Sequence, residues 1–157
     1  MINISIPDDE IEVMWDELEF ESNPQNGTKS ISQLKVIPDN ISGIYKLFSK
    51  DKTLLYIGKA MYIRRRIHQH LKSENDYIYD YRTHIKGFAY FIVNDPVERD
   101  IYETYMINLL MPKLNTSKLY TYQNNRNDYK TEETIVEELE FRRELIEKIR
   151  NRTTIEK

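Results

Sequence analysis

The chain has 157 residues, no cysteine and a formal net charge of −3, which excludes a disulfide framework and a thiolate zinc site. Charged residues make up 31% of the sequence and only four residues are glycine, which excludes a collagen-like or low-complexity chain. No apolar run approaches the roughly 18 residues of a membrane span, and the N-terminal MINISIPDDE lacks the pattern of a signal peptide. We therefore expect a cytoplasmic protein of one domain with no membrane partner.

The net charge hides a segregation along the chain. Residues 1–40 carry nine acidic and two basic side chains, whereas residues 41–90 carry ten basic and four acidic ones. A basic segment between acidic ends favours the steering of a polyanion to one face of the fold. A solvated basic helix in mid-chain explains the same pattern equally well, so charge alone leaves DNA binding open.

The first part of the chain predicts a β-hairpin followed by a helix. Residues 1–36 show only weak periodicity. Two short apolar runs at 44–48 and 54–57 are separated by the polar sequence SKDKT, which predicts a β-hairpin. From residue 60 onward apolar positions recur every three or four residues, so an amphipathic helix is expected to follow. Its buried stripe is predicted to contain Ala60, Ile63, Ile67 and Leu71.

The next part is predicted to add a strand between further helices. Residues 78–85 favour a short helix, although the alternating tyrosines there also suit a strand. Gly87 opens an apolar run at 88–93 that predicts a buried strand. Asp95-Pro96-Val97-Glu98 predicts a helix start, with Asp as N-cap and Pro at the first helical position. This helix is expected to end just before Pro112.

These patterns divide the chain into three segments of a small α+β protein. We expect an acidic N-terminal extension at 1–36, a compact core at 37–117, and a polar loop with a C-terminal helix at 118–157. The apolar stripe of the helix expected at 132–150 is narrow and interrupted by Arg142, which favours docking on its own core. A homodimer or a partner protein, bound through this helix or through the acidic N-terminus, is the alternative.

Helical periodicity places three candidate side chains on one border of the first helix. Arg66 and His70 are four residues apart, and Lys59 lies one turn earlier on the same border. Arg and Lys neutralise phosphate oxygens, and His moves a proton near neutral pH. Arg64 lies on the opposite border, and His68 diverges from His70 by about 200°, so the two histidines cannot chelate one ion. A surface helix rich in arginine, with no catalytic role, is the alternative.

One carboxylate in the later helix is expected to be partly buried. Glu103 shares a face with Ile107 and Leu110, and a carboxylate beside apolar neighbours needs a partner. That partner is either Arg99, one turn earlier, or a hard divalent cation that prefers oxygen ligands. A single carboxylate binds Mg²⁺ weakly, so substrate phosphates and waters would complete the coordination.

Two tripeptides on the predicted hairpin, Gly43-Ile44-Tyr45 and Tyr56-Ile57-Gly58, resemble the signature of the GIY-YIG nuclease superfamily. The rest of the family pattern follows in register, with a basic, a titratable, an acidic and an amide residue at the expected places. These positions are Arg66, His70, Glu103 and Asn115. Over residues 37–116 the pattern is similar to the N-terminal nuclease domain of the excinuclease subunit UvrC, although that group has a Tyr at the position of His70.

The resemblance implies a three-stranded antiparallel sheet flanked by helices, and hydrolysis of DNA phosphodiester bonds with one divalent cation, Mg²⁺ or Mn²⁺. Its implied metal ligand is Glu103. The implied catalytic residues are Tyr45, Tyr56, Arg66, His70 and Glu103. Substrate contacts are expected from Lys59, Arg64 and Asn115.

Two questions stay open from the sequence. The proton of the attacking water could pass to Tyr45, to Tyr56 or to His70, because a free tyrosine with a pKa of about 10 is rarely ionised at neutral pH. The substrate could be damaged, branched, sequence-specific or non-specific DNA, as in repair-like, restriction-like and phage-like enzymes. A DNA-binding module that keeps the fold without cutting is the alternative function.

Overall fold

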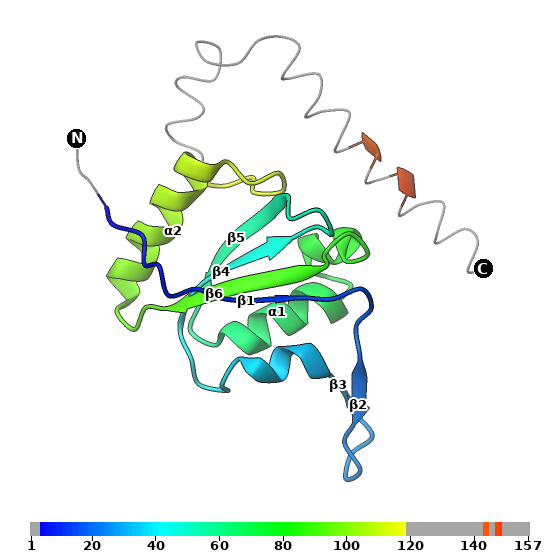
Figure 1. Ribbon diagram of the computed structural model, residues 1–157. Helices are drawn as coiled ribbons and strands as arrows, with labels where there is room; N and C mark the ends of the chain where they lie inside the picture. The colour runs from blue at the N-terminus through cyan, green and yellow to red at the C-terminus, as the bar shows by residue number, and fades with distance from the viewer. Residues whose placement is uncertain (1–3, 119–142, 145–146, 149–157) are drawn as a thin grey trace.

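The computed structural model of the protein describes residues 4–118, 143–144 and 147–148. Its centre is a four-stranded antiparallel sheet in the order β1-β6-β4-β5 (Figure 1). The strands are β1 (Ile11–Met14), β4 (Gly43–Phe48), β5 (Leu54–Ala60) and β6 (Gly87–Ile92). The fold class expected from the sequence is therefore confirmed.

Helices cover both faces of this sheet. On one face, α1 (Ile63–Lys72) packs with the short 3₁₀ helices η1 (Ser32–Val36) and η2 (Tyr77–Tyr81). On the other face, α2 (Pro96–Leu110) packs on apolar residues of β4, β5 and β6. Within the described residues, no helix is long and apolar enough to cross a membrane.

The sheet has four strands rather than the expected three, because part of the N-terminal segment joins it. β1 pairs antiparallel with β6, and the adjacent Trp15 is buried against Phe88 with ring centroids 6.0 Å apart. β2 (Phe20–Ser22) and β3 (Lys29–Ile31) form a separate hairpin that projects from the body (Figure 1). Weak periodicity did not predict β1, since a four-residue edge strand is too short to show a pattern.

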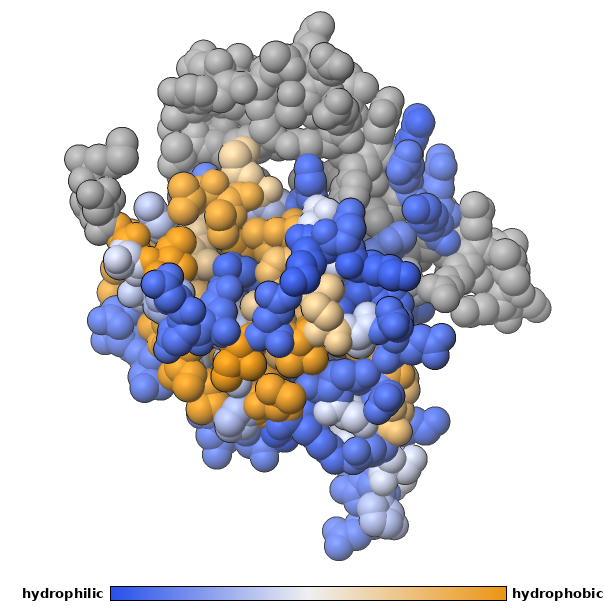
Figure 2. Space-filling view, in the orientation of Figure 1, coloured by the Kyte–Doolittle hydropathy of each residue, from blue (hydrophilic) through white to orange (hydrophobic). Residues whose placement is uncertain are grey.

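Acidic residues of this segment neutralise part of the basic middle of the chain. Glu10 forms an ion pair with Lys46 at 2.6 Å, and Glu12 forms one with Lys52 at 3.1 Å. The charge segregation seen in the sequence is thus partly compensated inside the fold. Figure 2 shows polar residues over the β2–β3 hairpin and hydrophobic residues gathered over α2.

The predicted hairpin and helices are found, with two changes. Ala60 ends β5 instead of opening the helix, which begins at Ile63. The region at 78–85 forms only the 3₁₀ helix η2 and a turn. Asp95 caps α2 as predicted, and the helix stops at Met111 in the left-handed conformation. The helix expected at 132–150 lies outside the described residues except at 143–144 and 147–148, which are helical.

The burial of Trp15 yields a stability prediction. Trp15→Ala is expected to lower the free energy of unfolding by about 3–5 kcal/mol, because it removes a large buried side chain and leaves a cavity. Phe20→Ala, at an aromatic residue that is 47% exposed, is the control and is expected to cost about 1 kcal/mol or less. Urea unfolding measures both, and equal costs would show that the N-terminal segment is not part of the core.

Candidate active site

Tyr45 and Tyr56 lie on the same face of the sheet, towards α1. In the β4–β5 register Tyr45 faces Gly58 and Leu47 faces Tyr56, so the two tyrosines are diagonal neighbours. Their ring centroids are 6.2 Å apart. A register shift beside Leu47 leaves Leu55 as an extra residue in β5, and such bulges re-aim the side chains that follow. Because of this bulge, the consecutive residues Leu55 and Tyr56 both face α1.

Gly58 is required by the position of the Tyr45 ring. A Cβ atom at Gly58 would lie 2.3 Å from the Tyr45 hydroxyl oxygen. The ring cannot move aside easily, because Tyr45 is only 1% exposed and core packing is tight. At Gly43 a Cβ would lie 2.0 Å from the Phe91 carbonyl oxygen. Each glycine of the two tripeptides thus allows a close approach across the sheet.

The Tyr45 hydroxyl and the His70 imidazole form a buried hydrogen bond. Tyr45 Oη and His70 Nε2 are 2.6 Å apart, and His70 is 1% exposed. The Tyr56 ring packs edge-on against the imidazole with centroids 5.2 Å apart. The structure therefore brings together three of the side chains predicted from the sequence, from β4, β5 and α1.

Asp76, which the sequence analysis did not single out, completes this group. Its Oδ1 lies 2.8 Å from His70 Nδ1, and its Oδ2 accepts a hydrogen bond from Arg66 Nη1 at 3.1 Å. The Arg66 side chain remains 41% exposed, so it can also meet a ligand. Since Asp76 follows the end of α1 and precedes η2, helical spacing could not place it beside His70.

Burial sets the ionisation of these groups. Burial raises the pKa of Tyr45 well above 10, and it also raises the pKa of Tyr56 despite the opposing charge of Arg66. Burial lowers the pKa of His70, although the hydrogen bond and charge of Asp76 act in the opposite direction. Burial alone would raise the pKa of Asp76. The hydrogen bonds from His70 and the Ile78 N–H, together with the charge of Arg66, outweigh this effect and lower the pKa. At neutral pH the group therefore holds two neutral tyrosines, a neutral imidazole and a carboxylate.

Glu103 is buried on α2 and is paired with Lys118. Lys118 Nζ lies 2.7 Å from Glu103 Oε1 and also contacts Asp100, one turn earlier. The alternative partner, Arg99, instead donates to the Val93 and Asn94 carbonyl oxygens. The Glu103 charge adds to burial in raising the pKa values of both Tyr45 and Tyr56.

Lys59 lies beside this acidic group, and the prediction that it shares a helical border with Arg66 and His70 is wrong, because it belongs to strand β5 and α1 begins only at Ile63. Its Nζ is 2.8 Å from Asp100 Oδ1, and its side chain is 40% exposed. Lys118 and Lys59 together lower the pKa of Asp100 to about 2. The edge of the sheet next to β5 therefore carries two carboxylates and two ammonium groups.

Asn115 holds the edge of β5. Its Oδ1 accepts from the Ile57 N–H and its Nδ2 donates to the Ile57 carbonyl oxygen, both at 2.9 Å. These bonds fix the strand residue next to Tyr56. A direct contact of Asn115 with substrate stays a prediction, because the bonds seen here are to the backbone.

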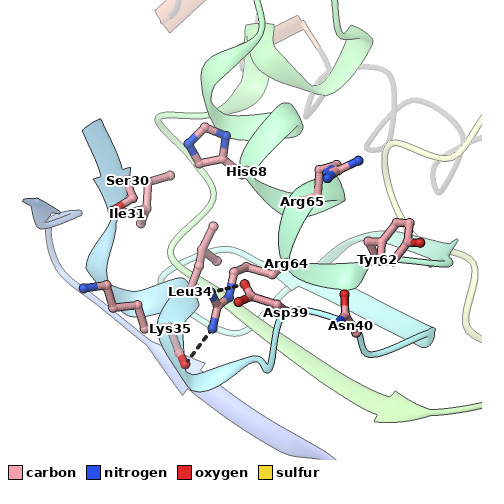
Figure 3. Close-up of a pocket in the computed structure, with 10 residues that line it drawn as sticks. All are labelled: Ser30, Ile31, Leu34, Lys35, Asp39, Asn40, Tyr62, Arg64, Arg65 and His68. Atoms are coloured by element: carbon pink, nitrogen blue, oxygen red, sulfur yellow. Dashed lines mark hydrogen bonds and ion pairs between the residues drawn. The ribbon is translucent and has the colours of Figure 1, made fainter. Parts of the chain in front are cut away.

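Arg64 lies apart from this group and lines a hollow of about 440 Å³ between η1 and α1 (Figure 3). Its Nε donates to the Ile37 carbonyl oxygen at 2.6 Å, and its Nη1 pairs with Asp39. His68 lines the same hollow, whereas His70 contacts Tyr45 and Asp76. The structure therefore does not bring Arg64 beside Tyr45, and its predicted substrate contact stays a prediction.

Comparisons with known proteins show which family the chain belongs to. Residues 41–116 match the family model of the UvrC-like GIY-YIG domain. The uncharacterized protein YurQ of Bacillus subtilis is 36% identical over 84 residues, which cover 54% of this chain and 68% of YurQ. UvrABC system protein C of Alkaliphilus metalliredigens is 33% identical over 97 residues, which cover 57% of this chain but 15% of that protein.

A solved structure has a related domain. It is a point mutant of the GIY-YIG N-terminal endonuclease domain of UvrC from Thermotoga maritima, bound to its catalytic divalent cation. It is 23% identical, covers 54% of this chain and 91% of that domain, and superposes with a TM-score of 0.47. The chain belongs to the UvrC-like GIY-YIG family. It spans only a small part of the length of the full UvrC protein it matches.

The buried imidazole yields a pH prediction. His70 is expected to titrate below the usual pKa of about 6.5, because burial disfavours the imidazolium. The folded protein then binds fewer protons than the unfolded chain as the pH falls through that value. The free energy of unfolding is therefore expected to fall as the pH is lowered below about 6.5.

Two-dimensional NMR measures the titration of His70, and urea unfolding at several pH values measures the stability. His70→Gln is the control, because it removes this one titrating group from the pH dependence. A His70 resonance that titrates above 6.5 would contradict the account of the site.

Proposed function

We propose that this protein is a divalent-metal-dependent endonuclease that hydrolyses DNA phosphodiester bonds. The observation that carries the proposal is the hydrogen-bonded chain from Tyr45 through His70 to Asp76, whose carboxylate also binds Arg66, together with the buried carboxylate of Glu103 on α2. Membership of the UvrC-like GIY-YIG family supports an endonuclease class. The kind of DNA that the protein cleaves is decided by the cleavage assay.

The geometry supports His70 as the final proton acceptor. Because His70 Nδ1 faces a carboxylate, it is the donor nitrogen, and the lone pair of Nε2 accepts from the Tyr45 hydroxyl. In the proposed step, the attacking water gives a proton to the Tyr45 oxygen while the Tyr45 proton moves to Nε2. The hydroxide formed in this way attacks phosphorus as the bond to the leaving oxygen breaks, and the released alkoxide takes a proton from solvent water.

This relay avoids a free tyrosinate. Burial raises the pKa of Tyr45 well above 10, so an ionised Tyr45 would be too rare to act as a resting base. In a concerted relay the tyrosine stays neutral, and the positive charge appears on His70 beside the Asp76 carboxylate. The arrangement follows the same logic as an imidazole oriented by a carboxylate in other hydrolases.

Basic side chains at the rim suit the phosphate. Arg66, which is 41% exposed on its side chain, would hold the non-bridging oxygens as negative charge develops. Lys59 is exposed beside Asp100 and would add a point charge for the DNA backbone. Arg66 lies on the α1 side of the sheet with the tyrosines, whereas Lys59 of β5 pairs with Asp100 of α2.

Glu103 fits the divalent cation that the family implies. A single ammonium group, Lys118 Nζ, already lies against both Glu103 and Asp100, so the carboxylates attract a cation at this position. Among the described residues no three His, Cys, Asp or Glu side chains gather as a metal site, so waters and substrate oxygens would supply the other ligands. When bound by Glu103, Mg²⁺ or Mn²⁺ would stabilise charge on the phosphate and the leaving oxygen.

The ion pair between Lys118 and Glu103 favours the alternative function, a DNA-binding module that does not cut. While Lys118 holds Glu103, a metal ion has to displace it. Cleavage therefore depends on whether metal and substrate together outcompete this ammonium group. The outcome of the cleavage assay separates the two functions.

A plasmid assay tests the proposal. The purified protein is expected to nick or linearise supercoiled DNA with Mg²⁺ or Mn²⁺ and to be inactive in EDTA. Glu103→Gln is expected to lose about 100-fold or more of the rate, because it removes the charged metal ligand. Branched and nicked oligonucleotides, assayed in parallel, identify the preferred DNA.

Glu98→Gln is the matched control, because Glu98 lies exposed on the first turn of the same helix. Lys118→Met is expected to lower the metal concentration needed for half-maximal cleavage, since it removes the competing charge. Binding of DNA without cleavage of any substrate in either metal would support the non-cleaving module instead. Cleavage that persists in EDTA or in Glu103→Gln would contradict the metal role.

A further inference from the structure

We propose that Asp76 is a positioning residue of this site, whose single carboxylate fixes both the tautomer of His70 and the orientation of Arg66. The proposal rests on the proposed nuclease function for its kinetic consequence. Its structural part, the state of the His70 ring, can be tested whether or not the protein cleaves DNA.

Asp76 is itself held rigidly. Its Oδ1 accepts the Ile78 N–H at 2.9 Å, which makes it the N-cap of η2. The same oxygen lies 2.8 Å from His70 Nδ1, and the side chain is 10% exposed. Both ends of the contact are therefore tied to secondary structure, Asp76 to the start of η2 and His70 to α1.

The carboxylate decides which nitrogen of His70 carries the proton. A carboxylate only accepts, so Nδ1 must donate and Nε2 must be left with its lone pair. That lone pair lies 2.6 Å from the Tyr45 hydroxyl oxygen. In the opposite tautomer the Nε2 hydrogen would face Tyr45, and the imidazole could not accept the tyrosine proton.

The second carboxylate oxygen orients Arg66. Asp76 Oδ2 accepts from Arg66 Nη1 at 3.1 Å, and the same nitrogen also donates to Gln69 at 3.1 Å. These bonds use one terminal nitrogen of a guanidinium that carries five N–H donors. The anchored side chain stays 41% exposed, as a phosphate clamp requires.

The groups that face His70 come from four elements. They are Tyr45 of β4, Tyr56 of β5, Arg66 of α1 and Asp76 at the start of η2. Among these four groups Asp76 supplies the negative charge. When His70 takes a proton, Asp76 stabilises the imidazolium and offsets the repulsion from Arg66.

NMR of the full chain labelled with ¹⁵N tests the structural part. The imidazole nitrogens of His70 are expected to show a protonated Nδ1 and an unprotonated Nε2 at neutral pH. In Asp76→Asn the preference for this tautomer is expected to weaken, because the neutral amide oxygen that still accepts the Ile78 N–H holds the Nδ1 hydrogen less strongly than a carboxylate does. A wild-type protein with the proton on Nε2 would overturn the proposal, with or without nuclease activity.

Kinetics test the consequence. Asp76→Asn keeps an oxygen for the Ile78 N–H, so the fold is expected to be retained, and its melting temperature checks this. Its kcat is expected to fall about 100-fold or more, and the acid limb of its pH–rate profile is expected to move to lower pH. The acid limb moves because Asp76→Asn removes the carboxylate charge that favours protonated His70, which lowers the pKa of the imidazole.

Asp80→Asn, at an exposed acidic residue of η2, is the matched control and is expected to keep both the rate and the profile. A loss of rate in Asp76→Asn with an unmoved acid limb and an unchanged His70 tautomer would indicate a merely structural role and overturn the proposal. If the wild type cleaves no DNA, the proposed function fails, while the NMR result still decides the role of Asp76.

Discussion

The buried hydrogen bond between Tyr45 and His70 is the interaction on which the rest of the site depends. Both side chains are 1% exposed, and a buried polar group without a partner would cost about 1–3 kcal/mol. The bond therefore requires a close approach of β4 to α1, a glycine opposite Tyr45, and a carboxylate behind the imidazole. Gly58 and Asp76 meet the last two requirements.

The position of the site at an edge of the sheet explains how both layers of helices reach it. β5 is the edge strand, and it packs against α1 and α2. The tyrosines face α1, whereas Glu103 comes from α2, and Asn115 pins the outer side of β5. The opposite edge is closed by β1, so the N-terminal segment stabilises the sheet at a distance from the proposed chemistry.

Local patterns in the sequence were enough to predict the hairpin, the cap at Asp95 and the border of α1 that carries Arg66 and His70. These features depend on spacing within one element. The partners of those residues were not predictable in the same way. Asp76 reaches His70 only because η2 turns back, and Lys118 reaches Glu103 only because the chain reverses after α2. Of the two partners that the sequence left open for Glu103, Arg99 is not the one found, because it donates to the Val93 and Asn94 carbonyl oxygens instead.

The proton relay is the central claim, and single-turnover cleavage by Tyr45→Phe tests it most directly. The substitution removes one oxygen and keeps the ring that packs beside Tyr56 and His70. With saturating Mg²⁺ and DNA, the account predicts a rate about 100-fold or more below wild type, with DNA affinity retained. A Tyr45→Phe protein that cleaves at the wild-type rate would contradict the relay and leave the proton to another group.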